Sequence, residues 1–285
     1  GLPAGLSVNS ASGVISGTPR EAGVFAVSLG ALNLSGQGGG VLVLRIAKAV
    51  LTVTATDATR PYGQANPIFA TSYSGFANGD TVATLAEVPK VTTTAGTLSA
   101  AGVYSLQPTG GASEKYAFSY GNGALTITKV PVVITAVNLT QSYTGWGLAP
   151  GLTTSVPDVA VTVTYNGATT RPVTPGTYAF VATPADGSYT GSAAGMLTIA
   201  RAEQQLAFAP LVATPLSVRG SEVQIEASST SGLPVTITLD AGSVATLSPA
   251  NKLEGIGAIG MVTLRASQAG DGNYLPATEV VLALD

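Results

Sequence analysis

The sequence of 285 residues has no cysteine and no histidine, and only 9% of its residues are charged. Without cysteine there are no disulfides, thiol nucleophiles or thiolate metal sites. Without histidine there is no Ser-His-Asp triad, and the commonest general base and transition-metal ligand are missing. The 12 Lys and Arg are scattered, whereas nucleic-acid binding needs clustered basic side chains. No apolar run approaches the ~18–20 residues of a membrane span. We therefore expect neither a nucleic-acid partner nor a membrane span.

The acidic residues are also dispersed. Glycoside hydrolysis needs two carboxyl groups facing each other across a cleft, and the 15 Asp and Glu suggest no such pair. No Asp-x-Asp run of the kind that binds calcium occurs. Asp186 and Asp271 each precede a glycine, so we interpret them as turn formers. Calcium bound by these residues at a module junction is the alternative. We expect no catalytic residue and no cofactor.

Strand-forming and turn-forming residues take the place of charge. Apolar residues make up 45% of the chain, with 35 Gly and 17 Pro. Thr and Val favour strands, and Gly, Pro, Asn and Asp favour the turns between them. No sustained apolar run has the i, i+3, i+4, i+7 spacing of an amphipathic helix. The composition predicts an all-β protein.

One short pattern recurs four times: a glycine, any residue, then an aromatic residue or Val, then alternating apolar positions. The copies begin at Gly23, Gly102, Gly176 and Gly260. Each is followed by a second apolar strand, at 41–46, 124–128, 196–199 and 280–284, and in the first copy we interpret Gly38-Gly39-Gly40 as the hairpin tip. A tyrosine lies between the two strands in three copies, at Tyr116, Tyr189 and Tyr274. We predict that each copy is a hairpin closing one small sandwich, with the tyrosine ring at the module edge and its hydroxyl in water.

The ends of these hairpins divide the chain into four modules. We predict module one over 1–47, module two over 48–130, module three over 131–201 and module four over 202–285. The connections are a few residues long, so the modules are expected to form an elongated, semi-rigid rod. In module one the closing hairpin comes only 23 residues into the chain. We therefore expect module one to be the C-terminal part of a sandwich whose front strands lie upstream or come from another chain.

Module one resembles the second half of a known domain of bacterial surface proteins. The residues are Gly1-Leu2-Pro3-Ala4-Gly5-Leu6-Ser7, then Gly13-Val14-Ile15-Ser16-Gly17-Thr18-Pro19. Together they are similar to the Putative Ig domain, a cadherin-like immunoglobulin fold. This resemblance implies a β-sandwich.

Modules two to four resemble the MBG domain and its relatives. Module two carries the pattern of the YGX type, in Arg60-Pro61-Tyr62-Gly63, Asn66-Pro67 and Asn78-Gly79-Asp80. Module three is similar through Tyr143-Thr144-Gly145 and Tyr189-Thr190-Gly191. Module four resembles the same group more distantly, through Asp271-Gly272-Asn273-Tyr274. The resemblance implies tandem immunoglobulin-like modules of a large secreted or surface-anchored bacterial adhesin.

The expected function is structural: a stalk that spaces a distal binding domain from the cell, with neighbouring modules of the same chain as its partners. An array binding glycans or host proteins is the first alternative. Its candidate residues are Trp146, the only Trp, in a loop between glycines, and Tyr165. Alternatively, Trp146 covers a module junction. The other alternative function is an accessory spacer of a secreted polysaccharide-degrading enzyme.

Overall fold

The structure is a computed structural model that describes residues 1–211 and 220–284. Within those ranges the regular structure is β-strand apart from one 3-10 turn at Val82–Thr84, as the composition predicts. The chain divides into two compact units. Unit 1 contains Gly1–Pro131 and the segment Asp186–Thr190, and unit 2 contains Val132–Ala185 and Gly191–Asp285. Each unit is described by itself.

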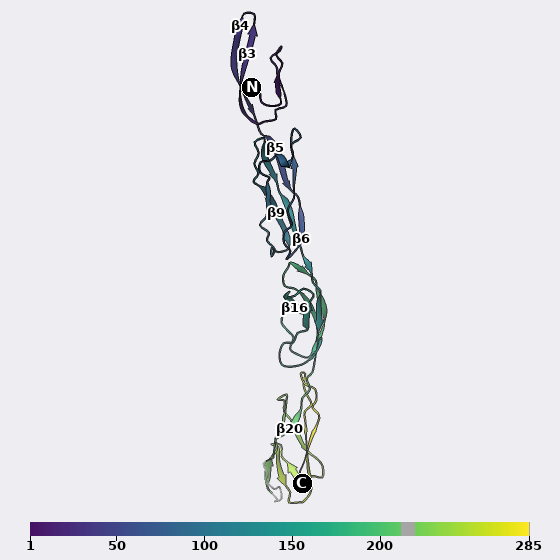
Figure 1. The fold of residues 1–285 in the computed structure, drawn as a ribbon. Helices are drawn as coiled ribbons and strands as arrows, with labels where there is room; N and C mark the ends of the chain where they lie inside the picture. Colours follow the sequence, from purple (N-terminus) through teal and green to yellow (C-terminus); the bar gives the residue numbers. More distant parts are fainter. Residues whose placement is uncertain (212–219, 285) are drawn as a thin grey trace. The chain divides into compact units, whose positions relative to one another are not determined.

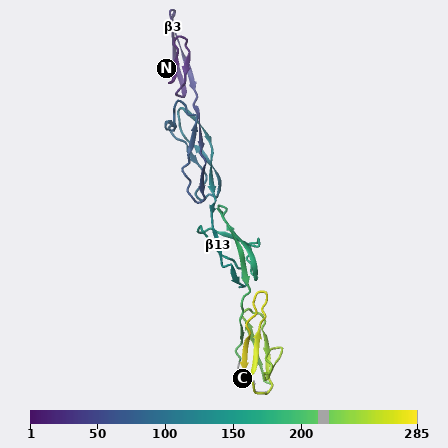
Figure 2. The ribbon, with the colours of Figure 1, turned by 90° about the vertical axis from the view of Figure 1, so that its right-hand side faces the viewer.

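Module one, in unit 1, consists of two antiparallel hairpins. The short one pairs β1 (Leu6–Val8) with β2 (Ile15–Gly17), and the long one pairs β3 (Gly23–Asn33) with β4 (Gly36–Ile46) (Figures 1 and 2). Glycines 38–40, which the sequence suggests as a hairpin tip, instead lie inside β4 opposite residues 29–31. The tip follows Asn33, whose Oδ1 accepts the Ser35 N–H at 2.8 Å. Pro3 and Val27 are the buried residues among residues 1–47, so this module has almost no core.

Module two, also in unit 1, is a sandwich of two sheets. Their strand orders are β10-β5-β7 and β6-β11-β9-β8. The strands are β5 (Ala49–Ala55), β6 (Ala58–Pro61), β7 (Thr71–Ser74), β8 (Lys90–Thr92), β9 (Gly102–Thr109), β10 (Tyr116–Gly121) and β11 (Gly123–Thr128). Alternate residues of β5 and β11 point between the sheets, and Leu51, Val53 and Leu125 are fully buried there.

Module three supplies strands to both units. In unit 1, β12 (Val130–Pro131) pairs in parallel with β18 (Tyr189–Thr190). In unit 2, β13 (Ile134–Val137) pairs with β15 (Gly151–Thr154), and a second sheet has the order β14-β19-β17-β16. Its strands are β14 (Thr140–Ser142), β16 (Val161–Tyr165), β17 (Gly176–Pro184) and β19 (Ala193–Ala200). Phe180 and Leu197 fill the space between these sheets.

Module four, in unit 2, packs three small sheets around one core of Ile225, Leu253 and Leu264. The strand orders are β20-β22, β21-β25-β24 and β23-β26-β27. The strands are β20 (Leu206–Phe208), β21 (Glu222–Gln224), β22 (Ala227–Ser229), β23 (Thr236–Leu239), β24 (Ala245–Leu247), β25 (Lys252–Gly255), β26 (Val262–Ser267) and β27 (Val280–Leu284).

The predicted antiparallel pairing of the two closing strands is present in all four modules, but β10 or β18 lies between the paired strands in modules two and three, so the connection there is not a simple hairpin loop. Each Gly-x-aromatic strand pairs antiparallel with its downstream strand, as β3–β4, β9–β11, β17–β19 and β26–β27. The glycine has a second role besides its backbone freedom. A Cβ on Gly176 would lie 3.4 Å from the Tyr178 ring, and one on Gly23 would lie 3.5 Å from the Phe25 ring. The aromatic residue therefore folds back over the glycine two positions before it, which explains the spacing.

Candidate binding surface

Trp146 lies in the loop between β14 and β15, and 79% of its surface is exposed. Gly145 before it has φ +84°, a conformation that favours glycine. The junction with module four is contacted by Tyr143, three residues earlier, whose ring packs on Tyr274. The exposed Trp146 indole can therefore stack on a ligand ring or a protein side chain.

Tyr165 cannot serve as the exposed aromatic that the sequence suggests. It ends β16, only 5% of its surface is exposed, and it packs in the core with Phe180 and Leu197. Desolvation by burial raises the pKa of its phenol. The Asn166-Gly167 turn that follows makes the position look like a loop in the sequence, but the ring belongs to the inward face of the strand.

Asp186 and Asp271 both shape turns. Asp186 Oδ1 accepts the Ser188 N–H at 2.8 Å, and Asp271 Oδ1 accepts the Asn273 and Tyr274 N–H groups, each at 2.8 Å. The hydrogen bond from Ser188 holds the pKa of Asp186 below its usual range. Among the described residues, no three Asp or Glu side chains gather where they could hold a metal ion.

Two of the three hairpin tyrosines have similar environments, and Tyr116 differs from them. Tyr189 and Tyr274 are half-buried. Tyr116 is 3% exposed, so the prediction of a wet hydroxyl at the edge is wrong for it. Its ring packs edge-to-face on Phe76, and its hydroxyl donates to Asp80 Oδ2 at 2.9 Å. Lys115 Nζ also contacts that carboxylate, at 3.2 Å.

This cluster predicts an acid-sensitive contribution to the stability of module two. The Tyr116 hydroxyl and then Lys115 lower the pKa of Asp80 below its usual value of 3.8. The contribution is therefore complete well above pH 3.8 and is lost as the pH falls from there through the lower folded pKa. We expect Asp80→Asn to destabilise the chain at pH 7 and to lose most of that effect near pH 2. Urea unfolding of both proteins at several pH values measures this. A difference that stays constant from pH 7 to pH 2 contradicts the assignment.

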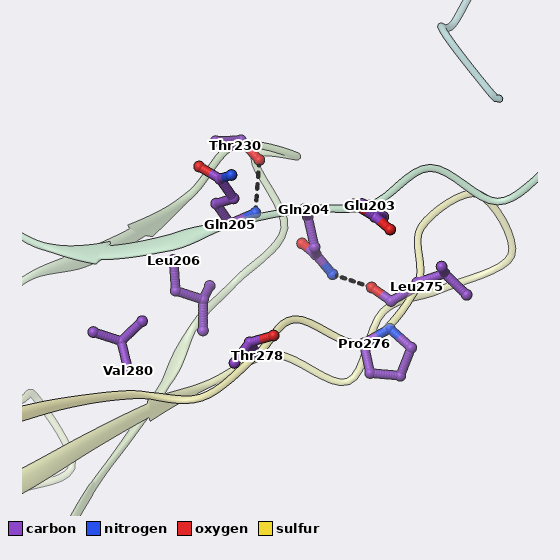
Figure 3. Close-up of a pocket in the computed structure, with 9 residues that line it drawn as sticks. All are labelled: Glu203, Gln204, Gln205, Leu206, Thr230, Leu275, Pro276, Thr278 and Val280. Carbon is purple, nitrogen blue, oxygen red and sulfur yellow. Dashed lines mark hydrogen bonds between the residues drawn. The ribbon is translucent and has the colours of Figure 1, made fainter.

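A cavity of about 690 Å³ lies in module four, between the start of the module and the segment that precedes β27 (Figure 3). Gln204 at its edge is buried and donates to the Leu275 carbonyl at 2.8 Å and to Gln268 Oε1 at 2.6 Å. The next residue, Gln205, donates its backbone N–H to Thr230 Oγ1, in the direction away from Leu275 (Figure 3). These amides are occupied in fixing the incoming chain to its module, a role that the sequence analysis did not foresee.

Sequence analysis also missed Arg60, which is 4% exposed inside module two. Its guanidinium donates from Nε to Asn66 Oδ1 at 2.7 Å and from Nη2 to the Gly96 carbonyl at 2.6 Å. Asn66 in turn donates to the Ala95 carbonyl at 2.7 Å. The motif residues Arg60 and Asn66 thus fasten the loop at 93–99. The place of both residues in the YGX-type pattern was the available sign that they have a structural role. The charge of Arg60 suggested instead that its side chain lies on the surface, because a buried arginine is rare.

The strand pairings define the class of protein: serial immunoglobulin-like β-sandwich domains. Among the described residues, no helix has the length and hydropathy that crossing a bilayer requires. The family comparisons place three known domains in the chain. Residues 1–47 match "Putative Ig domain", residues 51–126 match "MBG domain (YGX type)" and residues 133–203 match "MBG domain". Three successive segments of the chain are thus similar to MBG and Putative Ig domains.

Solved structures with similar tandem domains were also found. "Sidekick-1 immunoglobulin domains 1-4" is 15% identical, with 86% of this chain and 78% of that chain covered and a TM-score of 0.23. The N-terminal eight Ig domains of Down Syndrome Cell Adhesion Molecule are 10% identical, with 98% and 63% covered and a TM-score of 0.25. BT4661, a SusE-like surface located polysaccharide binding protein from Bacteroides thetaiotaomicron, is 9% identical, with 93% and 52% covered and a TM-score of 0.21. No curated protein matches the chain.

Proposed function

We propose that this chain is a spacer region of a secreted or surface-anchored bacterial adhesin, divided into modules at 1–47, 48–130, 131–201 and 202–285. The observation that carries this is the directness of the connections. β4 ends at Ile46 and β5 begins at Ala49, while β11 ends at Thr128 and β12 begins at Val130. Such short connections pass the chain from one sandwich to the next without a flexible linker.

Small-angle X-ray scattering of the whole chain tests the spacer. The expected result is the scattering profile of an elongated particle at both low and physiological salt. A compact profile, with modules folded back on one another, overturns the proposal. An accessory spacer of a secreted polysaccharide-degrading enzyme would need the same shape. The parent sequence separates the two, since a catalytic domain in it favours the enzyme.

Trp146 favours a second candidate function, the binding of a glycan or a host surface protein, because its indole is exposed on a loop rather than packed. A glycan array probed with the unmodified chain, Trp146→Ala and Met196→Ala tests this. Met196 is an exposed apolar residue of the same module and serves as the matched control. Binding that is lost only in Trp146→Ala, with the melting temperature unchanged, supports the binding function. No bound glycan, or equal binding by all three proteins, contradicts it for glycans.

A further inference from the structure

The three connections between modules end in the same short sequence, a basic residue followed by a small or branched apolar one: Lys48-Ala49, Lys129-Val130 and Arg201-Ala202. In each, the backbone N–H of the apolar residue donates to the carbonyl just before the hairpin tyrosine of the next module. The acceptors are Lys115, Ser188 and Asn273, at 3.0, 3.0 and 2.9 Å. The apolar residue then pairs in parallel with the tyrosine itself, as in Ala202 with Tyr274.

The basic residue contributes a side-chain contact to the same turn. Lys48 Nζ donates to the Ser113 carbonyl at 2.6 Å, and Arg201 Nη1 donates to the Asp271 carbonyl at 3.3 Å. Both carbonyls belong to the residue three positions before the hairpin tyrosine. The contact therefore repeats in position, although lysine makes it at one junction and arginine at the other. Each connection is thus hydrogen-bonded through its backbone to the module that it enters, and two of the three add the side-chain contact.

At two of the three junctions the tyrosine also contacts the preceding module. Tyr189 packs edge-to-face on Tyr62, with ring centroids 5.4 Å apart and an interplanar angle of 83°, inside unit 1. Tyr274 packs in the same way on Tyr143, at 5.5 Å and 87°, inside unit 2. We call these the junction tyrosine pairs. Edge-to-face rings at this separation attract each other beyond the area that they bury.

Each preceding tyrosine is held by the end of its own module. Tyr62 N–H donates to the Thr128 carbonyl and Tyr143 N–H to the Ala200 carbonyl, both at 2.9 Å. Thr128 and Ala200 are the last residues of the closing strands, immediately before the basic residue of the connection. The ring is therefore fixed at the point where the chain leaves the module. On the other side the Asp-Gly turn presents its partner, since Asp271 accepts the Tyr274 N–H.

The junction between modules one and two has no such pair. Tyr116 turns into its own module and packs on Phe76. A cavity of about 170 Å³ lies between Pro19 and Ile46 on one side and Ala77 on the other. The direct polar contact from loop to loop is a long one, Asn78 Nδ2 to the Pro19 carbonyl at 3.4 Å. The sequence before Tyr116 also lacks Asp-Gly.

We propose that the surface around Tyr62 and Tyr143 is a docking site for a following module that carries an Asp-Gly-x-Tyr turn. The tyrosine pair fixes the angle of that junction, whereas a follower without the turn is joined through a hinge. The partner is a module of the same chain, and the inference rests on the module division proposed above. The junction between modules three and four, inside unit 2, is then stiff, and bending within unit 1 occurs between modules one and two.

Distance measurements by double electron–electron resonance test this, because a chain without cysteine accepts labels at chosen sites. One labelled pair, Thr162→Cys and Thr246→Cys, spans modules three and four, and both positions are exposed. The expected distribution is narrow in the otherwise unchanged chain. Tyr143→Ala or Tyr274→Ala broadens it, and the double substitution broadens it no further, because either change removes the same contact.

Trp146→Ala is the matched control: it removes an aromatic ring from the same loop, three residues from Tyr143, but not from the pair. It leaves the distribution narrow, as does Tyr143→Phe, which keeps the ring. Melting curves recorded in parallel show whether module four is still folded in Tyr274→Ala. A distribution that stays narrow in Tyr143→Ala, or one that is already broad in the unchanged chain, overturns the proposal.

A second labelled pair, Ser28→Cys and Thr94→Cys, spans modules one and two at exposed positions. Its distribution is expected to be broader than that of the first pair, and an equally narrow one overturns the hinge. These outcomes are separate from the test of the spacer. Broad distance distributions for both labelled pairs contradict the docking site but are compatible with a spacer of flexibly joined modules. A compact scattering profile together with a narrow distribution across modules three and four contradicts the spacer but supports the docking site.

Discussion

Replacing Phe180 with alanine is expected to unfold module three at urea concentrations where the unchanged chain is folded. The Phe180 side chain is 1% exposed and lies between Tyr165 and Leu197 in the core of that module. Its ring also covers Gly195 on the paired strand, where an added Cβ would lie 2.9 Å from the ring. Truncating a buried phenylalanine costs about 3–5 kcal/mol. The whole stability of a small domain is only about 5–15 kcal/mol.

The measurement is urea unfolding of the full chain, followed by the fluorescence of Trp146, which lies in module three. Val181→Ala is the matched control, since it is the next residue of the same strand and points to solvent. Surface substitutions of this kind change stability by about 0.5 kcal/mol or less. Equal shifts of the urea midpoint by Phe180→Ala and Val181→Ala would contradict the prediction that the buried Phe180 ring stabilises module three.

Replacing Arg60 with methionine is expected to destabilise module two by about 2–5 kcal/mol, because each buried acceptor left unpaired costs about 1–3 kcal/mol. The closest acceptors that lose their donor are Asn66 Oδ1 and the Gly96 carbonyl, and the Pro61 and Thr97 carbonyls lose longer hydrogen bonds from Nη1. Methionine keeps most of the length of the side chain, so the change tests the guanidinium rather than the packing. The stability of Arg60→Lys is expected to lie between that of the unchanged chain and that of Arg60→Met, since an ammonium keeps the charge but cannot reproduce the forked geometry of the guanidinium.

Thermal unfolding of the full chain, followed by circular dichroism or calorimetry, measures this effect as a lower melting temperature for one transition. Lys90→Met removes a positive charge from an exposed position of the same module and serves as the control. Its melting temperature is expected to remain close to that of the unchanged chain. An Arg60→Met protein as stable as the Lys90→Met protein shows that the loop at 93–99 is held by other contacts.

Local features of the chain were predictable because their causes are local. Alternating apolar positions identify strands, and a glycine two residues before an aromatic ring allows the ring to fold back over it, as Gly176 does for Tyr178. Asp-Gly predicts a turn since the carboxylate can accept the N–H groups that follow, as at Asp271. The prediction failed for glycines 38–40, because a glycine run fits a strand as well as a turn when Asn33 already forms the tip.

By itself the sequence determined the all-β class, the pairing of the four sets of closing strands and the resemblance of its segments to MBG and Putative Ig domains. Only the tertiary structure decided which aromatic rings are available for contact. Tyr165 is buried, Trp146 is exposed, and Tyr274 pairs across a junction while Tyr116 turns inward, although the last two occupy the same place in the repeat. The reason is that a strand pattern fixes the face of the sheet on which a ring lies. Whether that face meets a second sheet, a neighbouring module or water depends on residues far away in the chain.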